Sequence, residues 1–368
     1  MPTIPRTEIS RSQSTLIDIA RILLLIQVIV GHLMALLVPP LAILKFDSIE
    51  GILLIAARAS FAYGREAAYI FIFLSGYFTA NQLFCNRVTA KDARSILYRR
   101  LKRLMGIGSI AVCYTIAMDW LGYSVFRIPI YRHNGLHIQL PEKLDALSVA
   151  LNFAQLQPSI VNPIGTNGPL WTLGYLVQFT VLGYVVRHCL KFNNKFIAAI
   201  TFIAALLAVI NPEFSCLLLV WLAGGWLGNR SFTSTTSISR MKIATRVIIL
   251  LLLIITARTQ GQYLAILICA GFGGLFISLV SQLRISISPY IARVTGALSA
   301  ATFGAYIFHL PLSFLLVGSY LNSNMAIDIK GQPGGTVAQF LVSCGVIVFI
   351  SMLLGQFMAS TLRMKRRG

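Results

Sequence analysis

Charged side chains are scarce in this sequence, and acidic ones are the scarcest. Asp and Glu together number 11 in 368 residues, and all charged types make up 11% of the chain. A soluble domain usually carries roughly 25% charged residues, so these are too few to cover a surface in water. Together with 57% hydrophobic residues and a mean hydropathy of +0.77, this scarcity predicts an integral membrane protein.

Signatures of other protein classes are missing as well. The six cysteines are scattered and form no CxxC pair, so neither a disulfide framework nor a zinc site is indicated, and we expect no metal. No glycine-rich phosphate loop occurs, which argues against nucleotide binding by that route, and no bound cofactor is expected. No internal repeat is visible, and no polar segment is long enough to fold as a separate soluble domain.

The basic residues are abundant, and their distribution decides what they imply. Lys and Arg number 31, which gives a net charge of +20. In a soluble protein this excess would suggest nucleic acid, but here the basic residues cluster in short segments between apolar runs. That distribution is typical of topology signals, so the predicted partner is an anionic lipid bilayer and not nucleic acid.

The fold class follows from the apolar runs. A membrane-spanning helix needs about 20 mostly apolar residues, and the sequence predicts an all-α polytopic bundle of about ten such helices. The expected spans are residues 16–38, 66–85, 104–123, 168–187, 196–211, 214–229, 245–257, 263–282, 297–320 and 336–357.

The basic loops predict the orientation of the bundle. Most Lys and Arg follow the second, fourth, sixth and eighth spans or lie in the C-terminal "RMKRRG". Ten spans would place all of these segments, and both termini, on the cytoplasmic side. The chain then divides into a cytoplasmic segment 1–15, a transmembrane domain 16–357 with an outer loop at about 124–167, and a basic tail 358–368.

A polar stripe runs along the first expected span. Arg21 and His32 are eleven residues apart, which is about three turns plus roughly 20°, so they share a face and lie about 16 Å apart along the axis. Asp18 precedes Arg21 by one turn and can pair with it. Ionisable residues at such depth face protein or water. Arg21 could instead snorkel to the interface, and His32 could be a hydrogen-bonded histidine of the bundle.

The stripe suits acyl transfer. A neutral imidazole at His32 can take a proton from a hydroxyl that attacks an activated acyl group. Arg21 could hold an anionic part of the acyl carrier, because about 16 Å is comparable to an extended pantetheine arm.

Four motifs give the chain a family resemblance. They are "LIDIARILLLIQVIVGH" (16–32), "YIFIFLSGYFTA" (69–80), "LYRRLKRL" (97–104) and "TFGAYIFHLP" (302–311). Their order along the chain resembles the acyltransferase-3 family of membrane O-acyltransferases, and Asp18, Arg21 and His32 fall on matching positions of its first helix. The segment "WTLGYLVQF" (171–179) departs from the family, because Leu176 and Val177 stand where glutamates are expected.

The resemblance implies an activity. An acyl group, most often acetyl, would pass from cytoplasmic acetyl-CoA or another acyl-CoA to a hydroxyl of a cell-surface or secreted glycan or glycolipid. The location implied is the bacterial inner membrane. Two alternatives stay open: a transporter or flippase of a lipid-linked saccharide, and a family member that has lost catalysis. The absent repeat and the near confinement of intramembrane charges to the first span weigh against the transporter.

Further candidates each have two interpretations. Arg99, Arg100 and Arg103 could bind donor phosphates, or serve topology and lipid headgroups. Ser75 could hydrogen-bond in the reaction cavity or, with Gly76, be a close-packing point. His309 could line the cavity or bend its helix near Pro311. Trp171 is a candidate cavity residue. Glu66 could be a cavity residue that replaces the missing glutamate, but it is expected as a solvated acid at a helix start. His133 and His137 could pair on a metal but lack a nearby third ligand, so they are expected as surface histidines.

Overall fold

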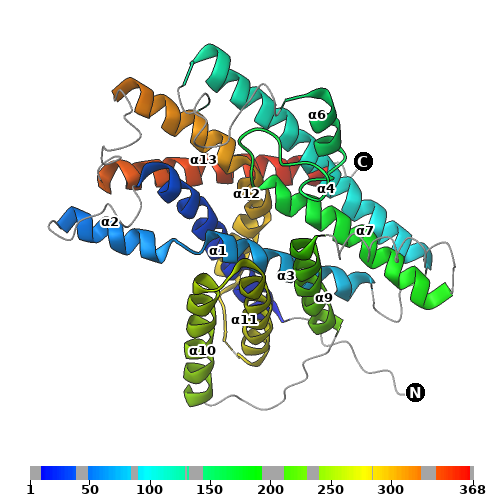
Figure 1. Ribbon diagram of the computed structural model, residues 1–368. Helices are drawn as coiled ribbons and strands as arrows, with labels where there is room; N and C mark the ends of the chain where they lie inside the picture. The colour runs from blue at the N-terminus through cyan, green and yellow to red at the C-terminus, as the bar shows by residue number, and fades with distance from the viewer. Residues whose placement is uncertain are drawn as a thin grey trace, which may run out of the picture. The chain divides into compact units, whose positions relative to one another are not determined.

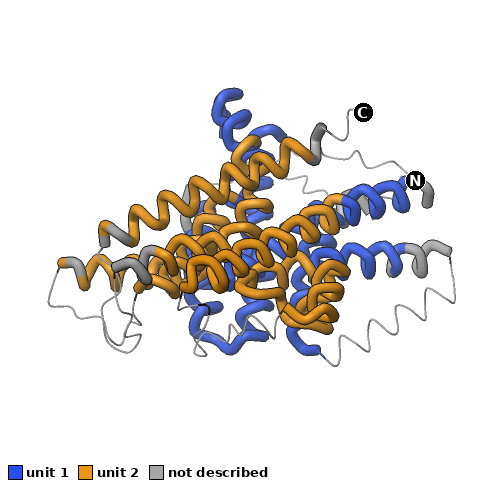
Figure 2. The backbone as a smooth tube through the Cα atoms, turned by 90° about the horizontal axis from the view of Figure 1, so that it is seen from above, with its two compact units in different colours: residues 1–21, 65–102, 175–296 blue, residues 22–64, 103–174, 297–368 orange. Residues whose placement is uncertain are grey.

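The computed structural model describes residues 10–38, 49–83, 90–128, 131, 144–192, 211–229, 240–283, 285–324 and 337–364, and all regular elements within these ranges are helical. Figure 1 shows them in chain order. The chain forms two compact units. Unit 1 comprises residues 1–21, 65–102 and 175–296, and unit 2 comprises residues 22–64, 103–174 and 297–368 (Figure 2).

Helix α1 (Arg11–Leu37) is closed at both ends by side chains. At its start, the Ser10 hydroxyl accepts from the Gln13 amide at 3.2 Å, and the Gln13 side chain accepts from the Ser10 amide at 3.0 Å. This is the reciprocal capping box expected of a Ser-x-x-Gln sequence. At its end, Arg58 of α2 (Ile49–Ser60) donates to the carbonyls of Met34 and Val38 at 3.2 and 2.6 Å. Both ends of the helix that carries His32 are therefore fixed.

Unit 1 is built on close helix crossings. It contains α3 (Gly64–Leu83), α9 (Pro212–Asn229), α10 (Arg240–Thr259) and α11 (Gln262–Gln282). Helix α11 packs against both α10 and α9 (Figure 1). Gly76 lets α3 approach α9, because a side-chain carbon at this position would collide with the Trp221 carbonyl oxygen. The indole of Trp221 is fully buried and packs near Phe179 of α7 (Leu170–Phe192).

Unit 2 holds the remaining elements. These are α2, the later parts of α1, α4 (Ala90–Trp120) and α12 (Pro289–Asn324), the start of α7, the single-turn π-helix η1 (Leu121–Val125), α6 (Ala146–Phe153) and α13 (Val337–Met364). Helices α12 and α13 meet at Gly304 and Gly355, where an added side-chain carbon on Gly304 would lie 2.7 Å from the Gly355 Cα. Small residues at a crossing are how membrane helices pack without a hydrophobic driving force.

The all-helical prediction is confirmed for the described residues. Helices α1, α3, α4, α7, α9, α10, α11, α12 and α13 coincide with nine of the expected spans, while the segment 196–211 lies almost wholly outside the described residues. Helix α2 was not expected; at 12 residues it is shorter than a span needs. By length and composition, five described helices could cross a membrane. Ten spans and cytoplasmic termini remain predictions.

Candidate active site

His32 of α1 and His309 of α12 form a contact within unit 2. Their rings stack with centroids 5.0 Å apart, and Nδ1 of His32 lies 2.8 Å from Nε2 of His309. His309 is completely buried, and His32 is half-buried. Of the two interpretations of His309, the structure supports a group that lies beside His32.

A backbone carbonyl fixes where the protons of this pair lie. Nδ1 of His309 is 2.7 Å from the Tyr306 carbonyl oxygen, which can only accept, so this nitrogen carries a hydrogen. In a neutral His309 ring, Nε2 is then an acceptor, and the hydrogen between the two rings belongs to Nδ1 of His32. For the neutral pair we therefore assign the lone pair of His32 to Nε2, the nitrogen that points away from His309.

Tyr306, three residues before His309, contacts the Trp-Thr-Leu motif of α7 beside this pair. The side chains of Tyr306 and Thr172 are hydrogen-bonded, and the Thr172 hydroxyl also lies 2.8 Å from the Pro169 carbonyl oxygen. Trp171, the second residue of α7, is half-buried, and its amide is bonded to the Gly168 carbonyl. Sequence alone gave Thr172 no role beyond matching a motif; the structure places it next to the turn of α12 that anchors His309.

Asp18 and Arg21 form the expected ion pair on α1. Their side chains are 3.6 Å apart and 24% and 28% exposed. Helix α1 is continuous from Arg11 to Leu37, so Arg21 and His32 share one helical face as the spacing predicts. The stripe thus lies on one continuous helix.

Ser75 and Arg100 meet within unit 1. The Arg100 guanidinium donates to the Ser75 hydroxyl at 2.8 Å and, through Nε, to the Thr180 hydroxyl at 3.1 Å. The neighbour of Ser75 is therefore a cation, which provides no base to activate a nucleophile. The close packing predicted for Gly76 is confirmed, and Ser75 is hydrogen-bonded to Arg100; a role for Ser75 in a reaction cavity stays a prediction.

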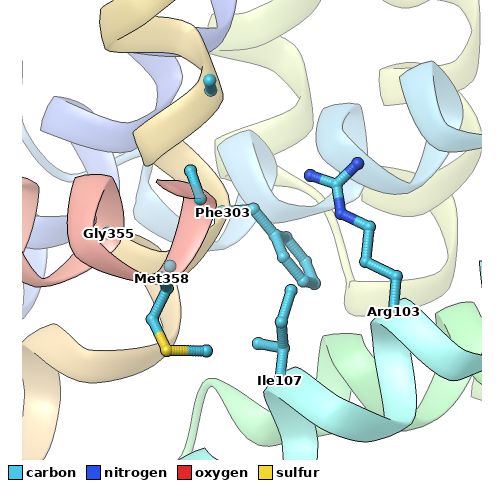
Figure 3. Close-up of a pocket in the computed structure, with 8 residues that line it drawn as sticks. Arg103, Ile107, Phe303, Gly355 and Met358 are labelled. Atoms are coloured by element: carbon cyan, nitrogen blue, oxygen red, sulfur yellow. The ribbon is translucent and has the colours of Figure 1, made fainter. Parts of the chain in front are cut away.

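The other arginines of the basic cluster lie differently. Arg99 and Arg103 are one turn apart on α4 and exposed, whereas Arg100 is half-buried. Arg103 borders a small, largely apolar pocket of unit 2, in which Phe303 and Ile107 lie between Met358 and the arginine (Figure 3). Its empty volume, including the open mouth, is about 220 Å³.

Glu66 overturns an expectation. It lies in the first turn of α3 as predicted, but it is not solvated: its side chain is fully buried and pairs with Arg65 at 3.2 Å through Oε1. Its second oxygen, Oε2, has no hydrogen-bond partner among the described residues. Leu176 and Val177, at the family's glutamate positions, are buried in α7.

Asp119 is the intramembrane acid that sequence reasoning passed over. It lies near the end of the third expected span, is fully buried, and accepts from the Thr166 amide at 2.9 Å and the Thr166 hydroxyl at 2.6 Å. The interpretation that charged residues within the spans lie almost only in the first one was therefore too strong. A lone Asp in an apolar window is the signal that could have identified it. His133 and His137 lie outside the described residues.

Comparison with known proteins supports the motif resemblance over nearly the whole chain. A family model described as an acyltransferase domain matches residues 15–356. No curated protein and no solved structure matches the chain. The matched region contains the histidine pair, the Asp18–Arg21 pair and the arginines of α4, so the geometry above is that of the family domain itself. This chain belongs to the acyltransferase-3 family and is a membrane acyltransferase.

Proposed function

We propose that this protein is an O-acetyltransferase of the bacterial inner membrane. It takes an acetyl group from cytoplasmic acetyl-CoA and places it on a hydroxyl of a cell-surface or secreted glycan. The observation that carries the proposal is the contact between His32 and His309 at 2.8 Å, which sets a defined tautomer at the position expected for a general base.

The proposed reaction uses His32 as the base. Nε2 of His32 removes the proton of the acceptor hydroxyl while its oxygen bonds to the acyl carbon. The carbon–sulfur bond of the thioester then breaks, and the proton passes from His32 to the departing sulfur to give coenzyme A. His309 acts as a positioning residue, because its Nε2 accepts from Nδ1 of His32 and orients that ring throughout.

Arginines support the proposed donor site. Arg21 lies about 16 Å from His32 along α1, so it suits an anionic part of a carrier whose acyl end reaches His32, and Asp18 steadies it. From their charge and their place on α4, we also assign Arg99, Arg100 and Arg103 to the phosphates of coenzyme A, although Arg100 already donates to Ser75 and Thr180. Glu66, Trp171 and Ser75 are assigned no chemical step.

The test is donor hydrolysis by purified protein in nanodiscs. Radiolabelled acetyl-CoA is supplied without acceptor, and coenzyme A release is measured for wild type, His32→Ala, Arg21→Ala and the control Arg258→Ala, which changes an exposed arginine at the end of α10. We expect slow release from wild type and the control, and a loss of about 100-fold or more in His32→Ala.

Two outcomes would contradict the proposal. Equal release by wild type and His32→Ala would remove the histidine pair from the active site. If wild type neither releases coenzyme A nor binds acetyl-CoA, that donor is excluded. The transporter or the degenerate alternative would then be favoured.

A further inference from the structure

Several buried oxygens of unit 2 have no hydrogen-bond partner among the described residues, and three of them belong to residues near the end of α4 and the segment before α7. These three are the hydroxyls of Tyr114 and Tyr131 and Oδ1 of Asn167. Asn167 is fully buried and Tyr131 is 1% exposed. Buried polar atoms in native proteins are nearly always paired with protein, water or ligand, so a cluster of unpaired ones indicates a polar ligand.

A hydrogen-bonded frame holds these groups in place. Asp119 accepts two hydrogen bonds from Thr166, and the Asn167 side-chain amide donates to the Thr115 hydroxyl at 2.8 Å. One N–H of the Asn167 amide is thus bonded to Thr115, and its Oδ1 is the atom without a partner among the described residues. These bonds join the segment before α7 to the end of α4, and the bond to Thr115 orients the side chain of Asn167.

Local backbone geometry brings Tyr131 to the same place. After η1 the chain reverses: the Ile128 amide bonds to the Gly122 carbonyl at 2.9 Å, and the Tyr131 amide to the Ile128 carbonyl at 3.2 Å. The Tyr131 ring then covers Gly122, where any side chain would collide with it. π-helical turns are frequent at functional sites.

The cluster adjoins both helices of the histidine pair. Tyr131 shares an apolar cluster with Leu310 and Phe314 of α12 and with Leu36 of α1. Leu310 directly follows His309, and Leu36 lies one turn after His32, about 6 Å along the axis. The Tyr114 ring meets Phe308, which directly precedes His309, with centroids 5.0 Å apart.

The charge of the cluster selects the ligand class. Burial raises the pKa of the Tyr131 phenol, and the nearby Asp119 carboxylate and Tyr114 raise it further, so this hydroxyl remains a donor. The cluster thus offers phenol donors and an amide acceptor beside a buried negative charge. A ligand anion would be repelled by an ionised Asp119, whereas the hydroxyls of a neutral sugar can both accept from the phenols and donate to the amide oxygen.

We propose that Tyr114, Tyr131 and Asn167 form the acceptor subsite, which binds the hydroxyls of an uncharged sugar unit next to the His32–His309 pair. This inference rests on the proposed function and adds the substrate's charge and the residues that select it. None of the three was identified as a site residue from the motifs.

The test compares neutral and anionic saccharides as acceptors. Cellotriose and maltotriose are the neutral probes, glucuronic acid is the anionic one, and transfer from radiolabelled acetyl-CoA is measured. We expect the neutral probes to be acetylated. In Tyr131→Phe and Asn167→Ala, the KM for the neutral probe should rise by up to about tenfold, as the loss of one hydrogen bond predicts, and by more than the KM for acetyl-CoA.

Controls separate the possible failures. Tyr290→Phe removes an exposed hydroxyl from the start of α12 and should match wild type. Thermal unfolding of each variant shows whether it is folded. Tyr131→Phe keeps the aromatic ring, so it still tests the subsite if Asn167→Ala does not fold. If wild type releases coenzyme A in a His32-dependent manner but acetylates no neutral probe, or if both variants keep the wild-type KM, the subsite is refuted and the donor chemistry stands.

Discussion

Nδ1 of His32 and Nε2 of His309 are 2.8 Å apart although 277 positions separate the two residues in the chain. The partner of the candidate base is thus another imidazole. A neutral partner orients the ring without adding a permanent buried charge, and an uncompensated charge would be costly at membrane depth.

Replacing His309 should impair the proposed reaction in a graded way. His309→Ala removes the acceptor for Nδ1–H of His32, so we expect kcat for coenzyme A release to fall about 10- to 100-fold, the usual cost of losing an orienting partner. His309→Gln can still accept through Oε1 and should retain more activity than His309→Ala. Equal rates in the two variants would show that acceptance by residue 309 has no role.

Replacing Arg100 should loosen unit 1. Arg100→Lys cannot reproduce two directed contacts to Ser75 and Thr180, so we expect it to destabilise the fold by about 1 kcal/mol. Ser75→Ala added to Arg100→Lys should cost less than it does in wild type, because the shared bond is already lost. Thermal unfolding in detergent measures both, with Arg94→Lys, an exposed arginine of the same helix, as the control. Strict additivity would argue against the contact.

Gly76→Ala should destabilise the protein more than an equivalent change elsewhere in a helix. The added methyl would force α3 away from the Trp221 carbonyl, which typically costs about 1–3 kcal/mol. Gly106→Ala on α4 is the matched control, because a side-chain carbon there meets nothing within 4 Å. The control should be neutral or stabilising by up to about 1 kcal/mol, given the helix preference of Ala. Equal melting temperatures for Gly76→Ala and Gly106→Ala would contradict the close crossing of α3 and α9.

Gly165→Ala should detach the segment before α7. Gly165 has a φ of +52°, and a methyl there would also collide with Asp119, the acceptor of both Thr166 bonds. The backbone conformation alone costs about 1–2 kcal/mol for a non-glycine residue. Hydrogen exchange over residues 154–169 should accelerate, whereas Gly261→Ala, in open space before α11, should leave exchange there unchanged. Unchanged protection in Gly165→Ala would disprove the role assigned to this glycine.

The start of α6 should lose protection in acid. Hydrogen bonds from Ser148, above all, lower the pKa of Asp145, the N-cap of this helix. A lowered folded pKa means that the carboxylate stabilises α6 above its unfolded pKa of about 3.9, and that this contribution disappears as the pH falls through the folded value. Asp145→Asn still caps but does not titrate. Hydrogen exchange, corrected for the intrinsic rates, measures this protection. We expect acid to lower the protection of the α6 start in wild type but not in Asp145→Asn. Equal loss of protection in both proteins would contradict the prediction.

Sequence reasoning succeeded where the information is local. The shared face of Arg21 and His32 and the pairing of Asp18 with Arg21 depend only on the period of one helix. It could not find the His32–His309 contact, because no local pattern reports which distant helices meet. Asp119 was passed over since one acid barely lowers the mean hydropathy of a span, and Glu66 was misread because a first-turn acid is usually solvated.

The oxygen that sets the proton of His309 belongs to the main chain at Tyr306. A substitution at position 306 can change the ring and its bond to Thr172, but it leaves that carbonyl in the chain. The tautomer of the His32–His309 pair therefore does not depend on which side chain stands at position 306. Substitutions there can change the packing around His309 while the reactive lone pair stays on Nε2 of His32.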